Sequence, residues 1–209
     1  MSALTLYVDL QFASPWAMAV FLTLTEKGLP FALKTVDLEA GESKRPPFRD
    51  LGLTGRVPTL VDGDFVLTES SAIIEYLEER FAQASVLPAD VHQRALCRQV
   101  QGWLRSDLPA LRAERPTTVI FYERSDKTLS EAAQTDAERL FRLAGRLVSG
   151  ANLFGDWSIA DAELALAIQR LAANGDPVPS SLAAYAHAQW QRPSVQQWVA
   201  LSRRQRTVS

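Results

Sequence analysis

The stretch RVPTLVDGDFVLTESSAIIEYL, residues 56–77, organises the rest of the chain. Residues 59–61 and 65–67 are apolar or β-branched, and Asp62-Gly63 between them is a strong signal for a short hairpin. A helix is expected from about Ser70, because isoleucine and leucine then recur at the spacing of an apolar stripe. The predicted order is therefore strand, tight turn, strand and helix.

Two points in this stretch are suited to holding a ligand. Glu69-Ser70 lies where strand becomes helix, and the free N–H groups and helix dipole found at such a place favour an anion. Pro58 begins a strand but cannot donate to its ladder, and a cis bond before it would let Val57 present its backbone to a ligand. The alternative interpretation is an ordinary hairpin and capped helix, with Glu69 as a solvated charge.

This ordered set resembles the glutathione-binding half of the glutathione S-transferase family. The resemblance depends on Val57-Pro58 followed by Glu69-Ser70-Ser71-Ala72-Ile73. It implies that a cis Pro58 fixes Val57, whose N–H and C=O pair with the cysteinyl part of glutathione. It also implies that Glu69 and Ser70 hold the γ-glutamyl carboxylate.

Composition limits the classes of partner and compartment. The chain has 209 residues and a formal net charge of -2, which argues against nucleic acid, and no window reaches the roughly 18 apolar residues of a membrane span. Met1-Ser2-Ala3-Leu4 has no basic segment and no long apolar stretch, so we expect no secretory signal. The single Cys97 suits a reducing cytoplasm, and its distance from His92 and His187 predicts no metal site.

The N-terminal half predicts an α/β domain. A strand is expected over residues 4–10, a helix over 14–27 with Ser14 as its cap, and a second strand over 31–38. A short helical crossover implies that these two strands are parallel. With the hairpin and its helix the order is βαβ-ββα, and the resemblance implies a thioredoxin-like, glutathione-binding domain over residues 1–81.

The C-terminal half predicts an all-α domain. Residues 82–90 are small and polar and are expected to be a linker, followed by an all-helical electrophile-site domain over residues 91–209. Its first helix is expected to run from 91 to about 114, bent near Pro109. Ser158-Ile159-Ala160-Asp161 has the form of a capping box at the start of a buried helix, and we interpret Asp161 as a folding element.

Ser14 is the expected catalytic residue. The resemblance implies a serine-type, theta- or zeta-like bacterial member, in which a hydroxyl at this place donates to the sulfur of glutathione. A thiol of pKa about 8.5 is mostly protonated at neutral pH, and a hydroxyl donor and the helix dipole both stabilise the reactive thiolate. Two alternatives remain: Tyr7 as the hydroxyl donor, as in tyrosine-type classes, and Ser14 as a plain helix cap.

The segment of residues 41–48 resembles the loop that contacts the glycyl end of glutathione. Many relatives have histidine where this chain has Ser43, so a cation would have to replace it. Lys44, Arg45 and Arg56 are the available cations, and we expect Lys44 and Arg56 to serve.

The second-substrate site is expected between the two domains. The resemblance gives Phe12, Trp103, Asp107 and Arg115 as candidates, each of which is more often plain core. Residues 103–108 and 114–117 are most similar to the enterobacterial YfcF-type group of the family.

The resemblance implies a cytoplasmic, homodimeric glutathione S-transferase acting in detoxification or oxidative stress. It would use glutathione as co-substrate and activate it as a thiolate for attack on small electrophiles, with peroxidase or dehalogenase activity as in some relatives. A non-catalytic binding or regulatory protein of the same fold is the alternative. A thiol-disulfide oxidoreductase is disfavoured because the sequence has no Cys-x-x-Cys.

Overall fold

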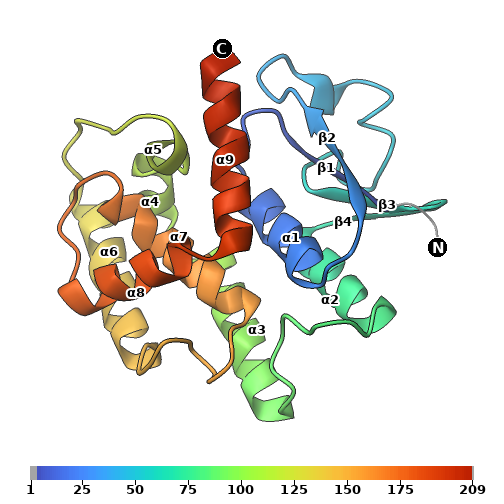
Figure 1. Ribbon diagram of the computed structural model, residues 1–209. Helices are drawn as coiled ribbons and strands as arrows, with labels where there is room; N and C mark the ends of the chain where they lie inside the picture. Colours follow the sequence, from blue (N-terminus) through green and yellow to red (C-terminus); the bar gives the residue numbers. More distant parts are fainter. Residues whose placement is uncertain (1–3, 209) are drawn as a thin grey trace. The chain divides into compact units, whose positions relative to one another are not determined.

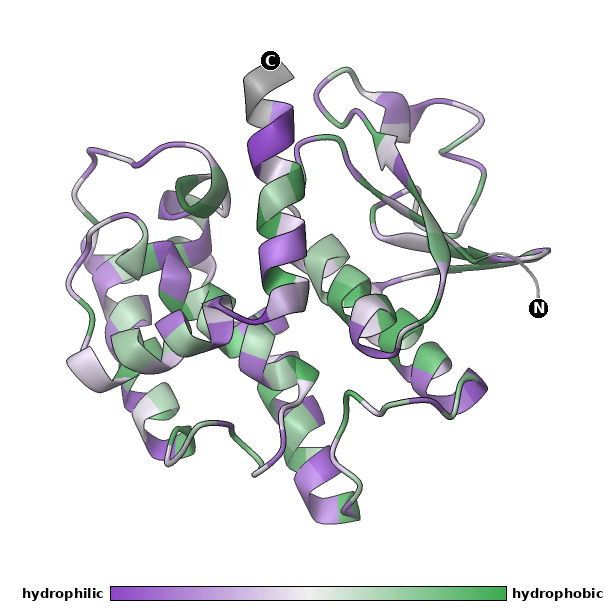
Figure 2. Cartoon of the chain, viewed as in Figure 1, coloured by the Kyte–Doolittle hydropathy of each residue, from purple (hydrophilic) through white to green (hydrophobic). Residues whose placement is uncertain are grey.

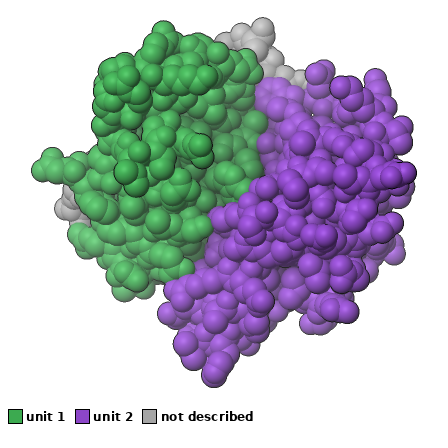
Figure 3. All heavy atoms as spheres, turned by 180° about the vertical axis from the view of Figure 1, so that it is seen from behind, with its two compact units in different colours: residues 1–86, 197–209 green, residues 87–196 purple. Residues whose placement is uncertain are grey.

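The computed structural model describes residues 4–208, with side chains to residue 205. The chain divides into two compact units: residues 1–86 with 197–209 form unit 1, and residues 87–196 form unit 2 (Figure 3). Met1 to Ala3 and Ser209 lie outside the described residues. The expectation of no secretory signal concerns the first of these two segments. The domain limits given above stay a prediction.

Unit 1 is built on a four-stranded mixed sheet (Figure 1). Its strands are β1 Leu4–Asp9, β2 Phe31–Val36, β3 Thr59–Asp62 and β4 Phe65–Thr68. The order across the sheet is β2-β1-β3-β4, with β1 parallel to β2 and antiparallel to β3. The expected βαβ crossover and hairpin are thus confirmed, and Gly63 at φ 61 makes the two-residue turn between β3 and β4.

Two long helices of unit 1 carry its apolar core. Helix α1, Pro15–Glu26, is hydrophobic along most of its length (Figure 2), and its residues 17–24 are all buried. Helix α2, Ser70–Arg80, buries Ile73, Ile74 and Leu77 and packs against α1. The apolar spacing that predicted α2 therefore marks the face it buries, whereas α1 is buried on all sides over residues 17–24.

A buried ion pair ties the end of α1 to α2. The Lys27 side chain is 1% exposed, and its Nζ donates to Glu78 at 2.8 Å and to the backbone oxygens of Gln83 and Ala84 at 2.9 and 3.2 Å. The same Glu78 carboxylate accepts from the Val86 N–H at 3.0 Å. The segment expected to be a plain linker is thus fixed to unit 1 over residues 83–86.

Unit 2 is helical in the part that the structure describes. Its helices are α3 Val91–Ser106, α4 Pro109–Glu114, α5 Thr118–Phe121, α6 Glu131–Leu147, α7 Ile159–Ala172 and α8 Ser180–Trp190, and the first residues of α9, Pro193–Val208, follow. Helix α7 packs against α3, α5 and α8 and is buried on nearly every side, as its composition predicted. The expected α/β domain followed by an all-α domain is confirmed.

The helix expected over residues 91–114 is in fact two helices. It breaks at Asp107 and Leu108, where Leu108 takes the left-handed conformation at φ 61. The buried Asp136 carboxylate from α6 accepts from the N–H groups of Ala110 and Leu111 at 2.9 and 3.1 Å. A side chain 25 residues away therefore caps α4, and a local pattern cannot show that.

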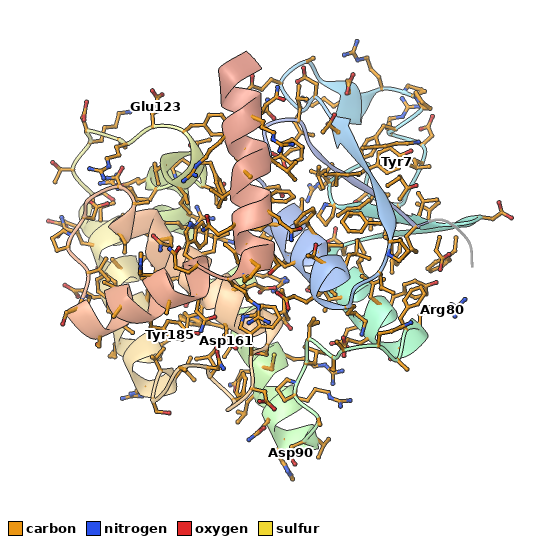
Figure 4. The ribbon with its side chains drawn as sticks, in the orientation of Figure 1. Tyr7, Arg80, Asp90, Glu123, Asp161 and Tyr185 are labelled. Atoms are coloured by element: carbon orange, nitrogen blue, oxygen red, sulfur yellow. The ribbon has the colours of Figure 1, made fainter. Side chains whose placement is uncertain are left out.

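The capping box that begins α7 is present. Asp161 is fully buried and accepts from the N–H and hydroxyl of Ser158 at 2.8 and 2.9 Å. Its other oxygen accepts from the Leu153 N–H and from the Tyr185 hydroxyl, which lies beside it (Figure 4). These bonds explain the role of Asp161 as a folding element.

Within residues 4–208 no helix combines the length and the apolar character needed to cross a membrane.

Candidate functional site

Several chain segments leave the unit 1 sheet at one end. Tyr7 of β1 pairs with Thr59 of β3, and Thr59 pairs with Thr68 of β4. Asp9 pairs in turn with Val36 at the end of β2. Because β3 runs against β1 and β4, this end holds the loop to α1, the loop after β2, the chain entering β3 and the start of α2. It also holds the N-termini of two helices, whose dipoles favour an anion.

Ser14 caps α1 at this end of the sheet. It is half-buried, and its Oγ accepts from the Ala17 N–H at 3.2 Å. The cap that was one interpretation of Ser14 is therefore present. This bond uses a lone pair of the oxygen and leaves the hydroxyl hydrogen available to an acceptor beyond the helix.

Asp9 holds the loop before Ser14, and the sequence reasoning did not single it out. Its carboxylate is 3% exposed and accepts from the Ala13 N–H at 2.6 Å and the Ser14 N–H at 3.1 Å. Burial raises the pKa of the Asp9 carboxyl, and the two N–H donors oppose that rise. The sequence does carry a signal for Asp9. It is an acidic residue at the end of an apolar strand, five residues before the serine that caps the next helix.

The Tyr7 hydroxyl is placed differently from Ser14. Tyr7 lies within β1 (Figure 4), and its ring packs against Phe48 at 5.6 Å between centroids. Lys34 of the neighbouring strand lies over the same ring and donates to the hydroxyl at 3.5 Å. Tyr7 is therefore a residue of the sheet face and not of a helix start.

The peptide bond between Val57 and Pro58 is cis, as the resemblance implied. Pro58 is buried and Val57 is half-buried. Among the described residues the N–H and C=O of Val57 make no hydrogen bond. Val57 therefore offers one donor and one acceptor at the sheet end.

Glu69 stands in a backbone conformation that side chains rarely adopt. It has φ 73 and ψ 113, is exposed, and precedes the first residue of α2 without capping it through its side chain. Ser70 beside it is buried. Such a conformation costs about 1–3 kcal/mol, which the surrounding structure must compensate. Residues held in this way cluster at ligand clamps and active sites.

The exposed cations near this end differ in what they already bind. Arg45 donates to the backbone oxygens of Ala40 and Gly41, and Arg49 pairs with Asp50 at 2.7 Å. Lys44 and Arg56 are exposed, and within residues 4–205 neither side chain has a partner. They are the two cations expected to serve.

Two of the expected second-substrate residues lie together in unit 2. The Trp103 indole N–H donates to Asp107 at 3.0 Å, and Arg139 donates to the same carboxylate at 2.9 Å. The Leu108 N–H, Arg139 and Trp103 hold the pKa of Asp107 below its usual value, so this carboxyl is an anion at neutral pH.

Arg115 is bound inside unit 2. It is 1% exposed, and its Nε and Nη2 donate to Asp176 at 2.6 and 2.9 Å. Nη2 also donates to the Lys127 backbone oxygen at 2.8 Å. Phe12, the candidate in unit 1, is 8% exposed and packs edge-on against Trp198.

Over the part of the chain that is described, no group of three or more His, Cys, Asp or Glu side chains has the arrangement of a metal site. Cys97 is buried, and burial raises the pKa of its thiol to about 11, so it is not a ready nucleophile.

Two family models match the chain. The Glutathione S-transferase, N-terminal domain matches residues 13–80, and the Glutathione S-transferase, C-terminal domain matches residues 90–204.

Relatives and solved structures agree with these models. Glutathione S-transferase 1 of Dianthus caryophyllus is 44% identical over 98 residues, 47% of this chain and 44% of that protein. Glutathione S-transferase theta-2 of Homo sapiens is 40% identical over 101 residues, 48% of this chain and 41% of that protein. The chain thus aligns with less than half the length of these two curated relatives.

Among the solved structures that match, one has a high sequence identity over nearly all of its length. It is a glutathione transferase homolog from Burkholderia GL BGR1 with bound glutathione, and it is 44% identical at a TM-score of 0.79. The match covers 97% of this chain and 98% of that one. With both domain models matched in order, the chain belongs to the glutathione S-transferase family.

Proposed function

We propose that this protein is a glutathione transferase whose glutathione site is the end of the unit 1 sheet. The observation that carries the proposal is the register that brings the loop of Ser14, the turn of Val57 and the start of α2 to that one end. The relative from Burkholderia, which is 44% identical, binds glutathione, and this supports the same ligand here.

Each group of the site has a role that fits its chemistry. The N–H and C=O of Val57 pair with the cysteinyl backbone, as a short strand would. The N-terminus of α2 and Ser70 bind the γ-glutamyl carboxylate, and Glu69 accepts from the α-ammonium beside it. Lys44 and Arg56 attract the glycyl carboxylate at the other end of the tripeptide.

Ser14 activates the thiol without a general base. Its hydroxyl donates to the sulfur while its oxygen continues to cap α1, and the helix dipole acts in the same direction. Both effects stabilise the thiolate over the thiol, so the pKa of bound glutathione falls below about 8.5 and the nucleophile forms at neutral pH.

The second substrate is a small electrophile. The cluster of Trp103, Asp107 and Arg139 combines an aromatic surface with a fixed charge pair, which suits an apolar molecule with a polar end. Arg115 contributes through the fold, because its donors are used inside unit 2. Conjugation, peroxide reduction and dehalogenation are separated by a panel of electrophiles, peroxides and haloalkanes.

The protein acts in the cytoplasm as a homodimer. Apolar side chains stand in solvent on each unit: Leu53 is 95% exposed and Phe65 47% in unit 1, and Val91 is 69% exposed in unit 2. A two-fold interface would cover such residues. Light scattering of the wild type and of Leu53→Ser tests this, and a stable wild-type monomer at micromolar concentration would contradict it.

An ultraviolet titration of the thiolate of bound glutathione tests the catalytic assignment. Loss of one hydrogen bond to a charged group is worth about 1.5–3 kcal/mol, so Ser14→Ala should raise the pKa by about one to two units. Tyr7→Phe should leave it unchanged. A change in the pKa of bound glutathione in Tyr7→Phe, with none in Ser14→Ala, would indicate a tyrosine-type enzyme. Tight binding of glutathione without turnover of any electrophile would indicate a non-catalytic binding protein.

A further inference from the structure

The loop between β1 and α1 is held by a residue from the far end of the sequence. Ser202 belongs to the unit 1 part of α9, and its Oγ donates to the backbone oxygen of Phe12 at 2.9 Å. The two residues are 190 positions apart. Phe12 itself has φ 52, a left-handed conformation that is unusual for a bulky side chain.

This contact lies inside the core of unit 1. Ser202 is 1% exposed, and Trp198, one helical turn earlier, is fully buried against the rings of Phe12 and Phe21 at 5.4 and 5.2 Å. The contact with Phe21 places this part of α9 against α1. Because water cannot replace the Ser202 hydroxyl there, its removal leaves the Phe12 oxygen without its donor.

The same peptide group is held at both of its ends. The C=O of Phe12 and the N–H of Ala13 belong to one planar unit. Ser202 donates to that C=O, while the Asp9 carboxylate accepts from that N–H at 2.6 Å. Asp9 also accepts from the next N–H, that of Ser14. This peptide group leads directly into Ser14, the cap of α1.

We propose that Ser202 is a positioning residue for the Ser14 hydroxyl, acting through the peptide group between Phe12 and Ala13. The proposal rests on the function proposed above, in which Ser14 donates to the glutathione sulfur. Ser202 does not touch the sulfur. It fixes the loop conformation that aims the donor, and a donor displaced by a fraction of an ångström loses much of its effect.

The variant Ser202→Ala tests this against the matched control Thr23→Val. Thr23 is also fully buried, and its hydroxyl donates at the same 2.9 Å, but to Ala19 of its own helix and not to the loop. In Ser202→Ala the pKa of bound glutathione should rise by about half to one unit. At a pH well below that pKa the thiolate fraction and kcat then fall about three- to tenfold, with little change in KM for glutathione.

Thr23→Val should lose thermal stability but keep the wild-type pKa of bound glutathione. Ser202→Thr retains the hydroxyl and should also keep that pKa. An unchanged pKa in a folded Ser202→Ala, or an equal shift in Thr23→Val, would overturn the positioning role and leave the proposed function intact. If Ser202→Ala does not fold, Ser202→Cys decides, because a thiol is of similar size but only a weak donor, and a wild-type pKa there overturns the proposal. A free-thiol pKa in the wild type would instead refute the proposed function, and this inference with it.

Discussion

Arg115 and Arg56 are both arginines that the sequence proposes as substrate-binding residues, but their surroundings in the two units are opposite. In unit 2 the Arg115 guanidinium is 1% exposed and is bound to Asp176 and to the Lys127 backbone. In unit 1 Arg56 stands in solvent, and within residues 4–205 its side chain has no partner. Both were candidates for the same broad task of holding a substrate.

The difference shows where binding capacity remains in a folded chain. A buried charge needs its partners for the fold, because an unpaired ion in the interior is costly, so those donors are not available to a ligand. An exposed charge at the sheet end makes no such demand and stays available. The following predictions test whether this distinction holds.

The largest effect is expected from Arg115→Leu. It leaves Asp176, whose side chain is 15% exposed, without its charged partner, and breaking a buried pair costs about 3–5 kcal/mol of unfolding free energy. Urea unfolding followed by circular dichroism measures it. Arg56→Leu is the control and should change the unfolding free energy by less than about 0.5 kcal/mol. Equal losses in the two variants would remove the distinction between them.

The sequence predicts elements with local causes and misses ties between distant residues. The hairpin, the Ser14 cap and the Ser158–Asp161 capping box follow from neighbouring residues. The break before α4 depends on Asp136, which is fixed only by packing.

The same limit applies to the candidate site. An ordered pattern within 13 residues predicts Val57, Pro58 and Glu69 as site residues. The ties of Asp9 and Ser202 to the loop of Ser14 appear only when β1 and α9 are placed in space. The φ of 73 at Glu69 has no sequence signal, since glutamate is not a residue that favours it.

The second prediction compares Glu69→Ala with Glu69→Gly. Both remove the carboxylate, so both should weaken glutathione binding tenfold or more, as loss of a charge-assisted bond of about 1.5–3 kcal/mol implies. Only glycine adopts φ 73 without strain, so Glu69→Gly should be more stable than Glu69→Ala by about 1–2 kcal/mol.

Calorimetry and thermal unfolding measure the two quantities separately. Glu79→Ala, an exposed glutamate on the same helix, should change neither. Wild-type affinity in both Glu69 variants would refute the assignment of this carboxylate to the ligand.

The third prediction concerns pH and the pair of Asp176 and Arg115. The hydrogen bond from Arg115 holds the pKa of Asp176 below its usual value, so the ionised carboxylate stabilises the folded state. This contribution is fully present above about pH 4 and is lost as pH falls through the lowered pKa. The difference in unfolding free energy between the wild type and Asp176→Asn should therefore shrink as the pH is lowered from about 6 to about 3. A difference that stays constant over this range would show that the pair does not control acid stability.

The smallest effects are expected from the exposed cations. Lys44→Met and Arg56→Met should each weaken glutathione binding about two- to fivefold, because an exposed ion pair is worth only about 0.2–1 kcal/mol. Arg49→Met is the matched control, since Arg49 is also exposed but already paired with Asp50 at 2.7 Å. The losses should fade as salt is raised from low to about 1 M, where the screening length falls to about 3 Å. Calorimetry at two salt concentrations separates this Coulombic attraction from a fixed hydrogen bond, which salt would weaken much less. If Arg49→Met weakens binding as much as the other two variants, the net charge at the sheet end attracts glutathione. The absence of partners for Lys44 and Arg56 would then not explain their contribution to binding.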